Sequence, residues 1–121
     1  MGLTLEIGAQ GERIAVKYLR EHGFLIHDLN WRAGRYEIDV IAERWGVLHF
    51  VEVKTRRSSG WSKPEDAITK EKFSALRHAA SSYIAQKRFF GETQFDLIAV
   101  EMQGDVAVEI RYIEKAMQCS W

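Results

Sequence analysis

The chain has 121 residues, 46% of them hydrophobic, which is enough for one buried core and too few for two. The sequence therefore predicts a single domain over 1–121 with a short C-terminal tail from about 114. Seventeen basic residues balance seventeen acidic ones, and a net charge of zero excludes a protein that coats nucleic acid by bulk electrostatic attraction. The first residues lack the pattern of a secretory signal, no apolar run is long enough to cross a membrane, and the single cysteine, Cys119, cannot form an intrachain disulfide. The expected location is the reducing cytoplasm, with no membrane partner.

A helix and a strand are expected at the start of the chain. Thr4 is a suitable N-cap for a helix that ends near His22, because Gly23 follows as a stop signal. Residues 24–29 alternate in hydrophobicity and predict a strand, while residues 30–35 predict a connecting loop with a turn at Gly34.

The centre of the sequence predicts a β-hairpin. Residues 36–43 and 47–54 are two strand-like runs with a glycine between them. If Trp45 and this glycine form a two-residue turn, counting outward along the strands places Asp39 opposite Glu52. Tryptophan is unusual where φ must be positive, so a longer loop with a shifted register is the alternative.

The second half of the chain predicts a helix followed by another hairpin. After a polar loop at 58–64, Thr69 can cap a helix that runs to about Lys87 with an apolar stripe. Residues 94–103 and 106–113 are strand-like and flank a Gly-Asp turn. The order of elements predicts an α/β fold in which a mixed sheet is flanked by helices.

Acidic side chains gather on one face of the central hairpin. Because side chains alternate along a strand, Glu37 and Asp39 share a face of one strand, and Glu52 and Lys54 share a face of the neighbouring strand. Counting along the hairpin places both pairs on the same side of the sheet. One interpretation is an exposed polar face on which Lys54 neutralises a neighbour. The apolar residues on both sides instead indicate central strands, where opposed carboxylates repel each other unless a cation lies between them. Mg²⁺ prefers such oxygen ligands.

Glu12 lies at the margin of the inward face of the first helix. A boundary glutamate that pairs with Arg13 or Lys17 is the simpler interpretation. However, Gly8 and Gly11 would let this part of the helix approach the sheet closely, which would bring Glu12 toward the acidic face.

Basic residues follow the second hairpin strand and continue into the second helix. We expect phosphate contacts from Thr55, Arg56, Arg57, Lys63, Lys70, Lys72 and Arg77, with Trp31 and Trp61 as stacking surfaces. Plain solvation is the alternative for each basic side chain. An exposed Trp45 would serve dimer packing or DNA contact equally well. The four histidines show no metal-ligand spacing, and for Asp96 we expect strand-end capping or pairing ahead of a role in the site.

Glu12, Glu37-Ile38-Asp39 and Glu52-Val53-Lys54 together resemble the PD-(D/E)XK nuclease superfamily, with the spacing of Holliday-junction resolvases. A longer set of segments is similar to the YraN family. It comprises Gly11-Glu12 with Ala15 and Tyr18-Leu19, Gly23-Phe24, Asn30-Trp31-Arg32, Glu37-Ile38-Asp39-Val40-Ile41-Ala42, Phe50-Val51-Glu52-Val53-Lys54-Thr55-Arg56, Ala67-Ile68 and Phe95-Asp96. The chain departs from the superfamily pattern in having Ile38 where the name-giving motif has proline.

The resemblance implies a restriction-endonuclease-like fold and a role for each matching residue. Asp39 and Glu52 would bind Mg²⁺ or Mn²⁺ together with the backbone carbonyl of Val53, and Glu12 would complete the metal shell. Lys54 would orient the attacking water and compensate developing charge.

The function that follows is a metal-dependent endonuclease acting on DNA, including branched or flapped forms, and a homodimer would present two such sites. The alternative is a catalytically silent adaptor that keeps the nuclease fold and binds nucleic acid or protein. A structural subunit whose partner covers the acidic face is a third interpretation.

Overall fold

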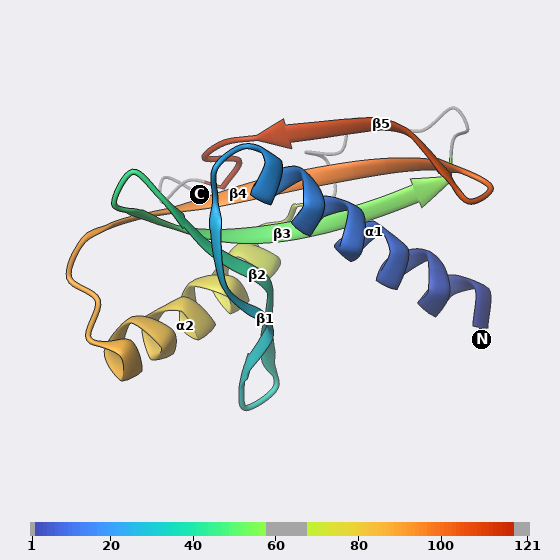
Figure 1. The fold of residues 1–121 in the computed structure, drawn as a ribbon. Coiled ribbons are helices and arrows are strands. Elements are labelled where there is room, and N and C mark those ends of the chain that lie inside the picture. Colours follow the sequence, from blue (N-terminus) through green and yellow to red (C-terminus); the bar gives the residue numbers. More distant parts are fainter. Residues whose placement is uncertain (1, 58–67, 118–121) are drawn as a thin grey trace.

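A computed structural model describes residues 2–57 and 68–117 and shows one mixed sheet with a helix on each face. The elements in chain order are α1 (Gly2–Glu21), β1 (Leu25–Ala33), β2 (Tyr36–Arg44), β3 (Val47–Arg57), α2 (Lys70–Lys87), β4 (Glu92–Gln103) and β5 (Val106–Ile113). The sheet order is β1-β2-β3-β4-β5, and every neighbouring pair is antiparallel except β3 and β4. The predicted α/β class with a mixed sheet is confirmed (Figure 1).

Each helix covers its own core on one face of the sheet. In Figure 1, α1 lies across β3 and β4 on one face, and α2 lies against the other face beside β2. Neighbouring residues of β3 point to the two cores: Phe50 packs with the residues of α2, and Val51 packs with Leu19 and other residues of α1. This alternation is the usual one for a central strand that is buried on both faces.

The helix ends show which local signals hold. Thr69 caps α2 as predicted, because its side chain accepts a hydrogen bond of 3.0 Å from the backbone N–H of Lys72. The predicted cap at Thr4 is wrong, since the helical backbone of α1 already begins at Gly2, and a capping preference alone does not fix a helix start. Gly23 follows α1 with a φ of +87°, as a C-terminal stop requires. Neither helix within the described ranges is long and apolar enough to cross a membrane.

Strand β1 is longer than the sequence predicts. The expected loop at 30–35 is wrong for residues 30–33, because β1 continues to Ala33 and pairs with β2 along its length. Residues 34 and 35 form the turn between the two strands. Trp31 and Ala33 pack against the core under α2, and the ring of Trp31 meets the ring of Tyr83 edge-on at 5.2 Å. This packing holds a polar segment in the sheet, and it places Trp31 against the core.

The β2–β3 hairpin has the register that counting outward from the turn predicts. Trp45 and its following glycine have φ values of +55° and +78°, and Arg44 pairs with Val47. The guanidinium of Arg44 lies over the Trp45 ring at 4.1 Å, so a tryptophan in a positive-φ position gains a contact there. The shifted-register alternative is therefore excluded, and the ladder runs as far as the pair Val40–Val51.

Candidate metal-binding active site

A hollow of about 450 Å³ opens where α1, β2, β3 and the start of α2 meet. It is lined by Gly8, Glu12, Asp39, Glu52, Val53, Lys54, Thr55, Arg56, Arg57 and Lys72. The hollow therefore brings together every residue that the sequence nominated for catalysis or metal binding. These residues come from α1 and from the two strands of the β2–β3 hairpin, which follows α1 and β1 in the sequence.

The hollow exists because the pairing between β2 and β3 ends just before Asp39. Their ladder ends at Val40–Val51, and the regular alternation of β2 breaks at the same point, since Ile38 belongs to the α2 core and Val40 to the α1 core. Asp39 Oδ2 then accepts a hydrogen bond of 2.9 Å from the backbone N–H of Val53. The carboxylate thus takes an amide of the neighbouring strand and stays at the mouth of the gap.

Asp39 carries the strongest electrostatic signal of the pocket. Burial, and after it the charge of Glu52, are the main causes that raise its pKa from 3.8 to about 7. The hydrogen bond from Val53 opposes the shift, while the charges of Glu12 and Glu37 contribute further in the raising direction. Several carboxylates therefore act on one another here, and a divalent cation is the partner that would favour their charged forms.

Glu52 is buried, with 7% of its surface exposed, and it has a counter-ion from α2. Lys72 Nζ lies 2.5 Å from Glu52 Oε2. Sequence reasoning nominated Lys72 for phosphate contact and did not anticipate this pair. The cap at Thr69 places Lys72 on the first turn of α2, but it does not show that this turn lies beside Glu52.

The donor set fits a hard cation that keeps part of its water. Asp39, Glu52 and Glu12 offer carboxylate oxygens, and Val53 lines the same pocket. In the part of the chain that the structure describes, no three His, Cys, Asp or Glu side chains form a ready-made metal cluster. An open arrangement of this kind suits Mg²⁺ or Mn²⁺, which are bound through one or two carboxylates plus substrate phosphate, better than it suits a closed structural site.

The position of Glu12 depends on a close contact between α1 and β3. A Cβ atom added to Gly11 would lie 1.8 Å from Oγ1 of Thr55, so only glycine allows this approach. Gly8, by contrast, has nothing within 4 Å of an added Cβ. The expected close approach of α1 to the sheet is confirmed at Gly11, and the next residue, Glu12, lies over the pocket.

The other nominated residues divide between the pocket and the rest of the surface. Thr55, Arg56 and Arg57 continue the pocket wall along β3. Lys70 and Arg77 do not line the pocket. Lys70 is exposed at the first residue of α2, and the guanidinium of Arg77 lies over the ring of Phe73 at 5.6 Å. Lys63 and Trp61 lie outside the described residues.

Glu37 pairs with a neighbour on the adjacent strand. Its Oε1 lies 3.6 Å from the Nη2 atom of Arg32 on β1. The sequence does not predict this pair, because it depends on the extension of β1, which brings Arg32 directly opposite Glu37.

Asp96 belongs to a separate buried network. His49 Nδ1 lies 2.6 Å from its carboxylate, and the hydroxyl of Tyr112, the amide of Gln94 and the backbone N–H of Lys115 donate to it. Burial raises the pKa of Asp96, but these hydrogen bonds together hold it below its usual value. The network ties β3, β4, β5 and the segment after β5 together, which agrees with the expected pairing role.

The mixed sheet, the two flanking helices and the acidic pocket beside the diverging strands define the class: an α/β protein with a restriction-endonuclease-like fold. The model of the uncharacterised protein family UPF0102, which is the YraN family, matches residues 11–100, and the chain belongs to this family. Similar relatives are the UPF0102 protein of Chlorobaculum parvum, 46% identical over 78% of this chain and 74% of its own, and that of Bacteroides thetaiotaomicron, 40% identical over 78% of each. The UPF0102 protein of Rhodococcus opacus is 36% identical over 96% of this chain and 99% of its own.

Proposed function

We propose that this protein is a Mg²⁺- or Mn²⁺-dependent endonuclease that hydrolyses phosphodiester bonds in DNA, including branched or flapped forms. The observation that carries the proposal is the convergence of Glu12, Asp39, Glu52 and Lys54 on one pocket. Three carboxylates beside an amine are the groups needed to hold a hard cation and a water near a phosphate.

Each side chain has a role that follows from its position. Asp39, Glu52 and Glu12, with the backbone carbonyl of Val53, would hold the metal ion. A bound divalent ion supplies polarisation of a phosphoryl oxygen and a lower pKa for its bound water. Lys54 follows Glu52 by two residues on β3 and lines the same pocket, so its ammonium group can orient the attacking water and compensate charge on the phosphate.

The basic wall of the pocket provides for the DNA backbone. Thr55, Arg56 and Arg57 extend from the acidic centre along β3, and Lys72 stands beside Glu52. Arginine presents a planar fork that matches phosphate oxygens, and threonine can donate to them. Lys70 and Arg77 on α2 would extend the contact to flanking phosphates.

A cleavage panel tests this proposal. Linear, flapped and four-way DNA and a matched RNA are incubated with Mg²⁺, with Mn²⁺ or with chelator. Some DNA should be cut only when the metal is present, and Asp39→Asn, Glu52→Gln and Lys54→Met should each slow the cutting at least ~100-fold. Asp105→Asn, an exposed change in the β4–β5 turn, is the matched control and should leave cutting intact. Equal cutting by the three pocket variants and the wild type would refute the assignment.

A second function has one observation in its favour. Lys72 already pairs with Glu52, so one of the metal-binding carboxylates carries a counter-ion from the chain itself. A catalytically silent adaptor that binds nucleic acid or protein through this fold would keep that pair. Calorimetric titration of Mg²⁺ and Mn²⁺ at millimolar concentration with DNA present distinguishes the two functions, because the adaptor binds no metal.

A further inference from the structure

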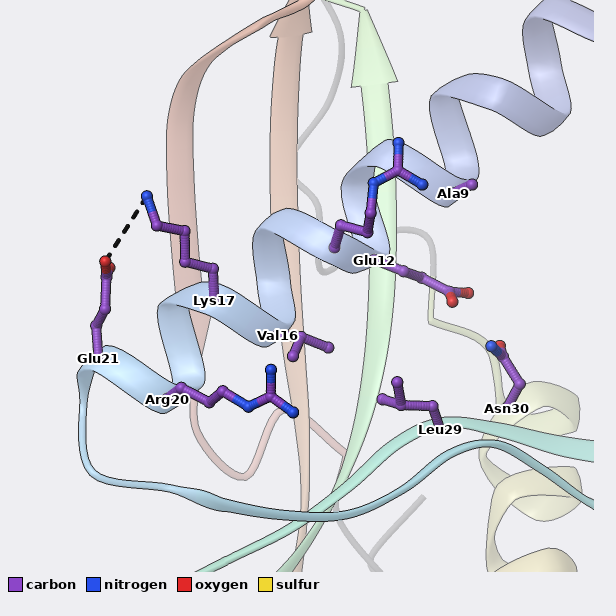
Figure 2. A pocket seen from close by; sticks show the side chains of 9 residues that line it. Ala9, Glu12, Val16, Lys17, Arg20, Glu21, Leu29 and Asn30 are labelled. Atoms are coloured by element: carbon purple, nitrogen blue, oxygen red, sulfur yellow. Dashed lines mark ion pairs between the residues drawn. The ribbon is translucent and has the colours of Figure 1, made fainter.

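A second hollow, of about 690 Å³, lies between α1 and β1 and meets the acidic pocket at Glu12, which lines both. Figure 2 shows Arg20 of α1 and Leu29 of β1 pointing toward the same space, with Glu12 and Asn30 at its other end. The volume falls in the range of pockets that hold small molecules, roughly 300–1,000 Å³. This second hollow, called the groove below, therefore borders the proposed site of cleavage at Glu12.

The chemistry of the groove combines an apolar floor with positive charge. Val16 and Leu29 form the floor, and Leu29 on the edge strand keeps 49% of its surface exposed. Lys17 pairs with Glu21 at 3.8 Å. Arg13 and Arg20 line the groove and have no ion pair within the described residues. Two cations are thus available beside a surface that offers van der Waals contact.

We propose that this groove binds an unpaired DNA strand that leaves the duplex beside the scissile phosphate. The substrate of the proposed nuclease would accordingly be a duplex with a single-stranded branch or overhang, and this inference rests on the proposed function. In a duplex the base faces are stacked and covered, so only unpaired bases can lie against Val16 and Leu29. Their phosphates would face Arg13 and Arg20.

The ends of the groove agree with this path. Glu12 belongs to the acidic pocket, so the strand would enter the groove at the metal-binding carboxylates. Asn30 stands at that end with a φ of +50° in the middle of β1, and its amide offers a donor and an acceptor to a base edge. At the far end, the Lys17–Glu21 pair leaves Arg20 as the cation facing the floor.

Binding without cleavage tests the groove separately from catalysis. Fluorescence anisotropy in chelator compares a labelled blunt duplex with the same duplex carrying a short single-stranded overhang. The wild type should bind the overhang duplex on the order of tenfold more tightly, since one base against an apolar surface supplies an effect of that size. Leu29→Asp and Arg20→Glu should each remove this preference while leaving the affinity for the blunt duplex unchanged.

Two changes elsewhere serve as matched controls. Leu25→Asp places the same substitution on the same strand at a residue that is 64% exposed and does not line the groove. Arg111→Glu reverses an exposed charge on β5, the opposite edge of the sheet. Both controls should keep the preference for the overhang, and their normal binding would show that the chain tolerates such changes.

The inference would be overturned if the wild type bound the two duplexes with equal affinity. It would also be overturned if Leu29→Asp and Arg20→Glu lowered the affinity for both duplexes by the same factor. Displacement of the overhang DNA by polyglutamate as effectively as by single-stranded DNA would also overturn it, since it would show that the groove binds any anionic chain and does not contact bases.

The outcomes also separate this inference from the proposed function. A preference for the overhang without metal-dependent cutting would support the groove and refute the nuclease. Metal-dependent cutting without a preference for the overhang would support the nuclease and refute the groove.

Discussion

Replacing Asp39 with asparagine should stabilise the metal-free protein while it removes the function. The pKa of Asp39 is raised from 3.8 to about 7, first by burial and then by Glu52. Ionising this carboxyl in the folded state therefore costs about 4 kcal/mol at most. Partial exposure and the shared charge with Glu52 reduce the expected gain to ~1–3 kcal/mol. Asparagine keeps the shape, and its oxygen can still accept from the N–H of Val53.

Urea unfolding followed by tryptophan fluorescence, in chelator at pH 5 and pH 8, measures this gain. The pKa of Asp39 is higher in the folded state than in the unfolded state. Protonated Asp39 therefore contributes fully to the free energy of unfolding of the wild type below about pH 4, and this contribution is lost as the pH rises to about 7. The free energy of unfolding of Asp39→Asn should therefore exceed that of the wild type clearly at pH 8 and much less at pH 5. Asp105→Asn, the exposed control, should follow the wild type at both values.

Adding Mg²⁺ at pH 8 should reverse the order of the two proteins. Metal that binds the folded state raises the free energy of unfolding of the wild type, while the asparagine variant has lost a charged ligand. If the variant is no more stable than the wild type in chelator at pH 8, or if the difference is the same at pH 5, then the crowding of carboxylates around Asp39 is not a cost to the fold and the reasoning fails.

Two further predictions concern stability. Gly11→Ala should destabilise the fold by ~1–3 kcal/mol because the new Cβ overlaps Thr55. Gly8→Ala, which has open space around the new Cβ, should stabilise α1 by ~0.5–1 kcal/mol. Equal urea midpoints for the two variants would contradict this pair of predictions. Tyr112→Phe should lower the free energy of unfolding by ~1.5–3 kcal/mol at pH 7, because it removes a hydrogen bond to the buried, charged Asp96. The difference in stability between this variant and the wild type should become smaller as acid protonates Asp96. A difference that stays constant down to pH 3 would argue against this prediction.

Local signals were enough to predict the hairpins and the second helix. A two-residue turn at Trp45 fixes which residues of the flanking strands face each other, so the ladder from Arg44–Val47 to Val40–Val51 followed from counting. The expected pairing of Asp39 with Glu52 did not, because the ladder ends one pair before them. Thr69 marked the start of α2 because a threonine hydroxyl satisfies an exposed N–H there. These features depend on residues that are close in the sequence, and pattern reasoning reaches them.

Features that depend on long-range contacts were out of reach. The second half of β1 lacks a clear strand pattern in the sequence, and it is a strand because Trp31 and Ala33 pack against the core under α2. The pair between Lys72 and Glu52 requires the orientation of α2 on the sheet, which no spacing in the sequence reveals. The distortion of β2 at Asp39 is a further example, because it appears only when Ile38 and Val40 are seen to belong to opposite cores.

The parallel pairing of β3 with β4 has a consequence for biosynthesis. The hairpin that contains β3 is complete on the ribosome well before β4 emerges, because α2 lies between them in the chain. During that interval one backbone edge of β3, a central strand that contains the buried residues Phe50 and Val51, has no partner. Unpaired edges of this kind invite association between chains, so slow translation across α2 favours aggregation of the nascent protein.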